Sequence, residues 1–386
     1  MTDTRTTLKS GKAEIERIYR RWIFVVITLM TLPLILLGII NYIIDPFSVF
    51  HSGILPYDFE INERFNKIKH LDQHHDRYNA YIMGSSRSGT TSPSLLEKHI
   101  LGSHFYNMTV AGCTQYDNEL HLQYFIEKRY PIKHIFLQID ISDIYGFKAP
   151  EGNYNAKHHP HVMHTSNSLF YLSYLTVLPV KRFIEKIKIN YFGGHKNYLR
   201  YDLVNSGRWY VDYLEAQIQA DPLKYIQEQP SFNQKVSRGS KGTKIKENIN
   251  ALKRFKTLTD AQNINLIVYI APHNHHMMDT FEHQSYVEYL REISKITPFW
   301  DFSGYNSITF NDRYYYESSH YRDVLAELVV KRIFNVPSSS MPHDFGHYIA
   351  ANNVEAHLQN QAMALAIRDE IKATSHTAST TAHFRL

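Results

Sequence analysis

The feature that most constrains this chain is an uncharged apolar run near its N-terminus, WIFVVITLMTLPLILLGIINYII, from Trp22 to Ile44. As a helix, at about 1.5 Å per residue, it is long enough to cross the roughly 30 Å hydrocarbon core of a bilayer. Secretory signals have shorter apolar regions that end at a small-residue cleavage site, whereas this run continues into NYIIDPF. Pro33 is tolerated in a membrane helix. We therefore expect an uncleaved anchor; the alternative is a helix buried in a protein core.

The charges on the two sides of this run are unequal. Basic residues gather before it, namely Arg5, Lys9, Lys12, Arg17, Arg20 and Arg21. Between the run and residue 70, basic side chains are fewer and are mixed with acidic ones: Arg64, Lys67 and Lys69 with Asp45, Asp58, Glu60 and Glu63. The positive-inside rule then places residues 1–21 in the cytoplasm and the rest outside it. The sequence predicts a single-pass protein of the cell (inner) membrane with a periplasmic or otherwise extracytoplasmic C-terminal domain.

Composition excludes some classes of function. The hydrophobic content of 43% and aromatic content of 13% suit a globular core. The net charge of +5 is modest, and no basic stripe alternates with aromatic residues. Nucleic acid is therefore not an expected partner. The single cysteine, Cys113, cannot form an internal disulfide and says nothing about the compartment.

Beyond the anchor, strand-like and helical segments alternate. The strand-like runs are 80–83, 104–108, 134–139, 265–270 and 298–302. Helical periodicity covers 93–99, 117–128, 243–262, 282–295 and 321–334. This alternation predicts an α/β fold in which a parallel sheet is covered by helices on both faces. In such folds the ligand site lies at the carboxyl ends of the strands.

These patterns predict a division of the chain. After the cytoplasmic N-terminus (1–21) and the anchor (22–44) we expect a juxtamembrane segment (45–79), an α/β domain (80–337) and a C-terminal region (338–386). Within the α/β domain, residues 146–240 break the alternation and are interpreted as an insertion near the mouth of the site. Its apolar stretch contains Pro179 and is too short for a second span. The C-terminal region has one expected helix, 353–371, and then an unstructured tail.

The turn after the first predicted strand is rich in hydroxyl groups, YIMGSSRSGTTSPS. Ser86 follows Gly84 and Ser85 at the edge of the sheet where chemistry is expected. Far downstream, YYYESSHYR places Glu317 three residues before His320. One loop can then supply a general base and the carboxylate that orients it. The alternative is that the serines form an ordinary polar turn.

This set of blocks resembles the SGNH (GDSL-like) hydrolase superfamily, and in particular its membrane-anchored branch related to the alginate O-acetylation proteins and the lipoteichoic-acid D-alanylation protein. The blocks that carry the resemblance are GSSR from Gly84 to Arg87, FYNMTVAG, and WDFSGYNSITF with YYYESSHYR; they lie within residues 80–145 and 263–335. The resemblance implies a three-layer, flavodoxin-like domain, with Ser86 as nucleophile, His320 as base and Glu317 as orienting acid. No cofactor is implied.

Two positions depart from the family pattern. Glu317 stands where the family usually has aspartate, and its longer side chain reaches the imidazole through a different rotamer. The usual Gly-x-Asn-Asp block is replaced by DISDI, so the asparagine position falls on Ser142, whose hydroxyl is a poorer oxyanion donor. Asn107, or the backbone N–H groups of Ser86 and Gly112, would then substitute. Loss of one good oxyanion donor typically costs about 10² to 10³ in rate.

Other polar residues near the predicted strand ends have two interpretations each. Arg87 either anchors an anionic substrate or forms a structural salt bridge. Asp140 and Asp143 either line the site or bond to neighbouring loops, and His273 follows a strand end and is a candidate substrate contact. Histidine clusters at 70–76, 157–164 and 273–278 lie on predicted loops without cysteines, so we expect no metal site there.

Two classes of function remain. In the first, the resemblance implies a serine O-acyltransferase or esterase that acts on O-acyl, and specifically O-acetyl, groups of a cell-surface or secreted polysaccharide. A multi-span membrane O-acyltransferase is then the expected partner. In the second, the chain is a catalytically inactive glycan-binding or scaffold subunit of an acylation complex.

Overall fold

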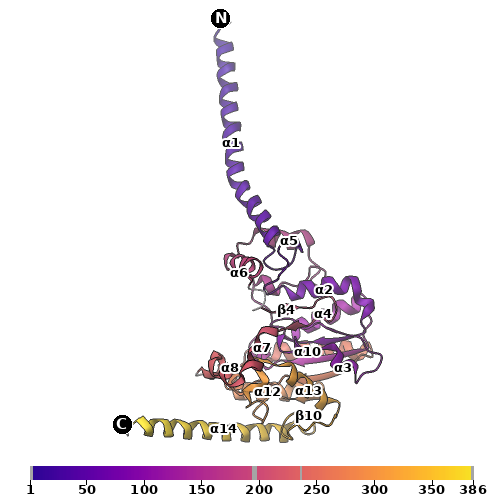
Figure 1. Ribbon diagram of the computed structural model, residues 1–386. Coiled ribbons are helices and arrows are strands. Elements are labelled where there is room, and N and C mark those ends of the chain that lie inside the picture. Colours follow the sequence, from indigo (N-terminus) through magenta and orange to yellow (C-terminus); the bar gives the residue numbers. More distant parts are fainter. Residues whose placement is uncertain (1–2, 194–197, 235–236, 384–386) are drawn as a thin grey trace. The chain divides into compact units, whose positions relative to one another are not determined.

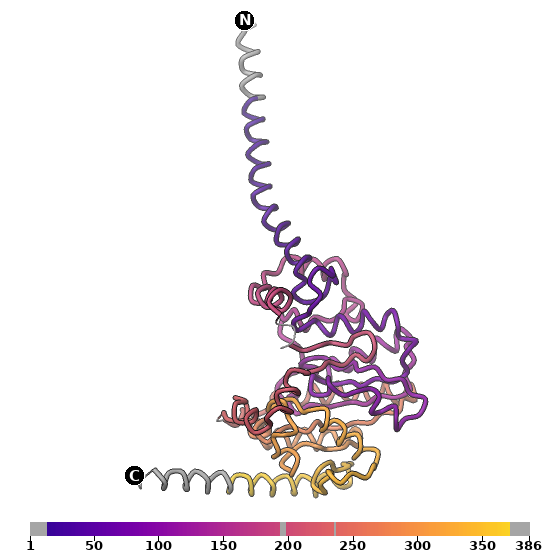
Figure 2. The backbone as a smooth tube through the Cα atoms, viewed as in Figure 1, coloured from indigo at the N-terminus to yellow at the C-terminus, as the bar shows by residue number. Residues whose placement is uncertain are grey.

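The structure is a computed structural model that describes the backbone of residues 3–193, 198–234 and 237–383, and side chains within residues 14–193, 198–234 and 237–370. Contacts divide the chain into two compact units. The first consists of residues 1–61 and 163–195, and the second of residues 62–162 and 196–386. Figure 2 traces the backbone of both in chain order.

The first unit is built on helix α1 (Asp3–Ile44), labelled in Figure 1. Among the described residues, Glu14–Ile44 is the one helix long and apolar enough to cross a membrane, and an 18-residue window within it has a mean hydropathy of 2.8. It contains the predicted anchor. Helices α5 (Asn167–Thr176) and α6 (Val180–Tyr191) contact α1.

The second unit contains a sheet of six strands in the order β10-β7-β6-β3-β1-β2. Its strands are β1 (Ala80–Met83), β2 (Phe105–Asn107), β3 (His134–Ile139), β6 (Asn265–Ile270), β7 (Phe299–Asp301) and β10 (His347–Ile349). The first five pair in parallel, as predicted. The edge strand β10 pairs antiparallel with β7 and was not predicted, because its short HYI sequence lies outside the strand–helix alternation.

Helices cover both faces of this sheet (Figure 1). They are α2 (Glu63–His74), α3 (Pro93–Glu97), α4 (Gln115–Glu127), α10 (Ile245–Ala261), α12 (His283–Ser294) and α13 (Asp323–Ile333). Side chains of a strand alternate between faces. Accordingly, Tyr81 and Met83 join a core with α4, α10 and α12, whereas Ile82 joins a core with α3 and α13. The predicted α/β fold with a mostly parallel central sheet is confirmed.

Shorter elements complete the second unit. They are α7 (Asp212–Ala220), α8 (Pro222–Glu228), α9 (Pro230–Asn233), α11 (His275–Met278), the hairpin of β4 (Arg200–Tyr201) and β5 (Trp209–Tyr210), and the hairpin of β8 (Tyr315–Glu317) and β9 (His320–Tyr321). Short 3₁₀ turns occur at His75–Arg77, Ser86–Ser88, Ile141–Ile144, Tyr154–Ala156 and Asp312–Tyr314.

Three segments differ from the sequence-based division. The segment 146–240 is shared between the units, with 163–195 in the first. The segment 45–79 divides after Ile61, because Ile68 and Leu71 of α2 are buried in the core of the second unit. Helix α14 (Val354–His383) continues through most of the tail expected to be unstructured. Between 354 and 383 no glycine or proline interrupts the helix.

Candidate active site

The turn after β1 exposes one serine and buries its neighbours. Gly84 has a φ of +139°, and a Cβ there would lie 2.7 Å from the Oε1 atom of Gln138 on β3, so the turn requires glycine. Ser85 is 3% exposed, and Ser88 is fully buried and hydrogen-bonded to the hydroxyl of Tyr269 at 2.7 Å. Ser86 begins the 3₁₀ turn and is partly exposed. It is therefore the serine of this turn that a substrate can reach.

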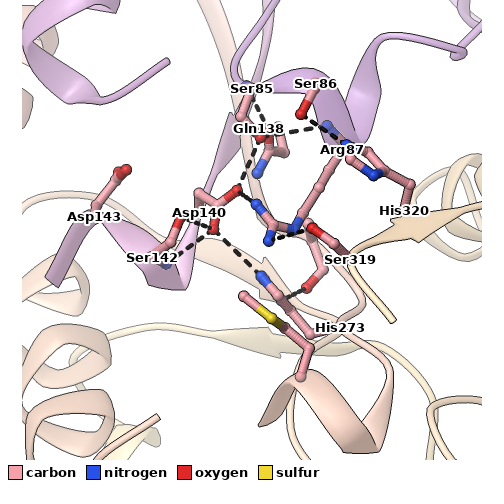
Figure 3. A network of polar contacts seen from close by, with 12 residues as sticks. Ser85, Ser86, Arg87, Gln138, Asp140, Ser142, Asp143, His273, Ser319 and His320 are labelled. Carbon is pink, nitrogen blue, oxygen red and sulfur yellow. Dashed lines mark hydrogen bonds and ion pairs between the residues drawn. The ribbon is translucent and has the colours of Figure 1, made fainter. Parts of the chain in front are cut away.

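A histidine and a glutamate lie in line with this serine. The Oγ of Ser86 is 2.8 Å from the Nε2 of His320, as Figure 3 shows. The Nδ1 of His320 is hydrogen-bonded to the Oε1 of Glu317. Because a carboxylate only accepts, Nδ1 carries the proton and Nε2 is left to accept the serine O–H. Glu317 and His320 face each other across the β8–β9 hairpin, which places base and acid on one rigid element.

Hydrogen bonds keep the carboxyl group of Glu317 ionised. Burial alone would raise its pKa, but the bonds from His320 and from the backbone N–H of Ser319, at 2.7 Å, outweigh burial and lower that pKa. An ionised carboxylate at this position stabilises the imidazolium that forms when His320 takes a proton. The geometry therefore has the three parts of a nucleophile, a base and an orienting acid.

An aromatic side chain that the sequence analysis did not single out contacts the histidine. The ring of Trp209 meets that of His320 edge to face, with centroids 5.9 Å apart and an interplanar angle of 78°. Its backbone N–H donates to the carbonyl of Gly89 at 3.0 Å, next to the nucleophile turn. Trp209 lies in the irregular stretch 146–240, where no periodicity or motif could have assigned it to the site.

Arg87 belongs to a buried polar network beneath the nucleophile (Figure 3). Its guanidinium forms an ion pair with Asp140 and donates to the Oγ of Ser319 at 3.0 Å. Asp140 also accepts from the Oγ of Ser85 at 2.8 Å. Burial would raise the pKa of Asp140, but the charge of Arg87 holds that pKa well below its usual range. Of the two interpretations of Arg87, its 6% exposure and its contacts favour the structural salt bridge. The network ties the turn after β1 to the end of β3 and to the catalytic hairpin.

Three residues predicted to contact substrate or oxyanion use their polar atoms inside the protein. The amide of Asn107 donates to the carbonyls of Ser88 and Thr91 at 2.9 and 3.0 Å. The Oγ of Ser142 donates to Asp140 at 2.7 Å. His273 is fully buried, with its ring nitrogens 2.8 Å from the carbonyl of Ala271 and 3.3 Å from Asp140. These contacts stabilise the loops and strand ends that position the site.

The backbone offers the remaining oxyanion donor. Among the described residues, no acceptor is recorded for the N–H of Ser86, which is the first of its 3₁₀ turn and lies beside the nucleophilic oxygen. Gly112 is exposed, has a φ of +61°, and its carbonyl accepts from Arg64 at 3.2 Å. The Ser86 N–H is thus the donor that the geometry identifies most directly.

Asp143 lies apart from this network, and no dashed contact joins its side chain to it in Figure 3. It is fully buried and accepts from the amide of Gln115 at 3.0 Å and the hydroxyl of Tyr289 at 3.1 Å. Burial and the nearby charge of Asp140 raise its pKa well above the usual range. Asp143 therefore has a structural role, since its carboxyl group bonds to Gln115 and Tyr289 inside the protein.

Two groups of histidine and aspartate side chains come together that the sequence did not predict. They are Asp72 with His159 and His161, and His275 with His276 and Asp312; within each group the potential ligand atoms lie within 4.8 Å of one another. The sequence showed no sign of these groups, because each combines residues that lie far apart along the chain and neither contains a cysteine. Three ligands are the minimum of a zinc site, so both groups are candidate ligand sets.

No protein-family model matches this chain, and a search of curated proteins finds no match. Its function is therefore argued from the geometry of the site.

Proposed function

We propose that this protein is a membrane-anchored, extracytoplasmic serine acyltransferase or esterase of SGNH type that acts on O-acyl groups of a cell-surface or secreted glycan, with O-acetyl as the acyl group. The observation that carries the proposal is the continuous set of hydrogen bonds from Glu317 through His320 to Ser86. It lies at the carboxyl edge of the parallel sheet, where α/β folds bind their ligands.

The proposed reaction proceeds through an acyl-enzyme. The Oγ of Ser86 attacks the ester carbonyl while the Nε2 of His320 takes the hydroxyl proton, and Glu317 stabilises the imidazolium. The N–H of Ser86 donates to the oxyanion. Collapse of the tetrahedral intermediate breaks the ester bond, and His320 gives its proton to the departing alkoxide. A glycan hydroxyl or water then attacks the acyl group with His320 as base, the bond between the acyl group and Ser86 breaks, and His320 returns the proton to the Oγ of Ser86. No cofactor is required.

A pocket lies next to the strands β5 and β8 that carry Trp209 and Glu317, and none of its lining residues belongs to the triad. Tyr210 and Tyr316 are among its lining residues, together with the charged side chains of Arg208 and Asp323. Tyr210 follows Trp209, and Tyr316 precedes Glu317. Within it, Arg208 pairs with Asp323 at 2.6 Å and lies over the ring of Tyr210, so the proposed glycan substrate rests on the resemblance and not on this pocket.

The anchor and its flanking charges support the proposed location. Basic residues precede the apolar segment, so residues 1–21 are proposed to be cytoplasmic and the second unit extracytoplasmic. A multi-span membrane O-acyltransferase that delivers the acyl group is the proposed partner. A reporter that is active only outside the cytoplasm, fused after Leu386, should be on, and a reporter that works there only in the cytoplasm would overturn this orientation.

Labelling with a fluorophosphonate probe tests the nucleophile. Detergent-solubilised full-length protein should react, and Ser86→Ala or His320→Ala should lower labelling by several orders of magnitude because triad members act as a unit. Glu317→Gln should lower it less. Ser94→Ala, on the exposed start of α3, is the matched control and should label normally. Full labelling of Ser86→Ala would show that the nucleophile is another residue.

One observation favours the second candidate function, an inactive glycan-binding or scaffold subunit. The side chains of Asn107 and Ser142 donate to partners within the protein, so of the predicted oxyanion donors the backbone N–H groups of Ser86 and Gly112 are left. The two functions differ in a deletion strain. If the enzyme proposal holds, acetate released chemically from the purified polymer falls and Ser86→Ala fails to restore it. If Ser86→Ala restores acetate as well as the wild type does, the scaffold function holds.

A further inference from the structure

Helix α6 exposes an apolar face. Its exposed stripe consists of Val180, Ile184, Ile187 and Tyr191, whose side chains are 54%, 48%, 36% and 70% exposed. These positions are spaced by four, three and four residues and so lie on one side of the helix. A helix on a water-facing surface normally turns such a stripe toward the core.

The charged face of the same helix is turned inward. Arg182 donates to the carbonyls of Pro46 and Phe59 at 2.9 and 2.7 Å. Lys186 has a side chain that is 2% exposed and donates to Asp58 at 2.7 Å. Two cations of α6, Arg182 and Lys186, therefore hold the loop that follows the anchor, while the stripe of apolar side chains faces outward.

The C-terminal end of α5 contacts the apolar part of α1. A Cβ on Gly38 would lie 3.8 Å from the Cβ of Leu175. Gly38 precedes the end of α1 at Ile44 by about 9 Å along the helix. The amide of Asn41 donates to the carbonyls of Leu175 and Val177 at 2.9 and 2.8 Å. Backbone carbonyls need such internal partners where water is scarce.

The apolar surface continues beyond α6. Leu169 and Leu172 on α5, Leu178 between the helices and Phe192 after α6 are 68%, 52%, 65% and 78% exposed. All belong to the first unit, together with the exposed apolar residues of α1. These exposed side chains therefore belong to the same compact unit as the helix proposed to cross the membrane.

We infer that α5 and α6 form a lipid-binding collar that enters the outer leaflet around the end of the anchor. This inference rests on the proposed membrane insertion of α1. Lys181 and Lys188 on α6 are exposed, as lysines commonly are at membrane interfaces, and Lys188 pairs with Glu185 at 3.1 Å. Lipid is favoured over a protein partner because the contacts to Gly38 and Asn41 place the end of α5 at the depth of apolar residues of α1.

Depth-dependent fluorescence quenching tests the collar. Full-length protein carrying a single nitrobenzoxadiazole label is placed in phosphatidylcholine–phosphatidylglycerol nanodiscs that contain a spin-labelled lipid. The test positions are Ile184→Cys and Ile187→Cys. Ile35→Cys on α1 reports the anchor, and Lys224→Cys on α8, a side chain 66% exposed, reports water. Unsubstituted protein, whose cysteine is buried, is the unlabelled blank.

The collar predicts quenching at 184 and 187 of at least half that at 35, with little at 224. Quenching at 35 but not at 184 and 187 would overturn the collar and leave the anchor intact. No quenching at 35 would instead refute the membrane insertion on which the collar depends. Self-quenching at 184 that rises with the protein-to-lipid ratio, without lipid quenching, would show that a second copy of the chain covers this face.

Discussion

A single methyl group at Gly89 should disturb His320, the proposed general base, through Trp209. A Cβ at Gly89 would lie 1.8 Å from the Nε1 and 2.5 Å from the Cε2 of the indole, far inside van der Waals contact. The backbone of Gly89 accepts an L side chain, since its φ is near −64°. The indole must therefore move, and it contacts the ring of His320.

The magnitude follows from the packing. Overpacking of a buried site costs about 1 to 3 kcal/mol, which corresponds to a fall in Tm of about 2 to 10 °C for a domain of this size. A displacement of His320 by about 1 Å relative to Ser86 would lower the labelling rate by about 10²-fold. Gly89→Ala should thus lose both stability and reactivity, measured by thermal unfolding and by fluorophosphonate labelling of the solubilised protein.

Two further variants test whether the effect passes through the contact between Gly89 and Trp209. Gly146→Ala is the matched control, because the nearest atom to its Cβ is the Cγ2 of Thr114 at 3.9 Å, and it should leave Tm and labelling unchanged. Adding Trp209→Leu to Gly89→Ala removes the clash, so the double variant should be more stable than the sum of the two single losses predicts. Simple additivity, or a Gly89→Ala protein with wild-type Tm and labelling, would refute the proposed contact path.

Three other predictions concern buried polar groups. Asp140→Asn leaves the guanidinium of Arg87 buried without a charge partner and should lower the free energy of unfolding by about 3 to 5 kcal/mol; a loss below about 1 kcal/mol in urea unfolding would contradict this. Burial lowers the pKa of His121 to about 3, so the unfolded chain takes up a proton below about pH 6.5 that the folded chain does not, and stability falls with acid. Between pH 6.5 and 4.5 this lowers the free energy of unfolding by about 2 to 3 kcal/mol. His121→Gln should remove this loss from the pH profile of unfolding. A variant with an unchanged profile would contradict the prediction. Burial also raises the pKa of the Cys113 thiol, so maleimide should label Cys113 only after denaturation, and rapid labelling of the native protein would disprove its burial.

Local sequence signals predicted the scaffold of the site. The runs at β1, β3 and β6 are short, apolar and bounded by polar turns, so their limits could be read directly. The three-residue spacing of Glu317 and His320 predicted that the two side chains could bond, and they do so across the β8–β9 hairpin. Strand limits and short spacings depend on residues that are close together in the sequence, and these are the residues that composition and periodicity describe.

Features that depend on distant residues could not be predicted in this way. Trp209 reaches His320 only because the β4–β5 hairpin lies beside the turn at Gly89. Asn107 had the right chemistry for an oxyanion donor, but the loop carbonyls that occupy its amide are set by the folded turn. The division of 146–240 between two units follows from contacts with the residues after the anchor, which leave no periodic signal.

The interleaved construction of the first unit has a consequence for biogenesis. Its early segment ends at residue 61, and its second segment starts at residue 163. At about 5 to 20 residues per second, roughly 5 to 20 s of synthesis separate the two. Until Arg182 and Lys186 emerge, the carbonyls of Pro46 and Phe59 lack the guanidinium of Arg182, and Asp58, which also accepts from Ser48, lacks the ammonium group of Lys186. The loop after the anchor must therefore stay open while residues 62–162 are made, and it closes only when the later helices arrive. A chaperone that binds nascent chains at the membrane would bind this loop during that interval.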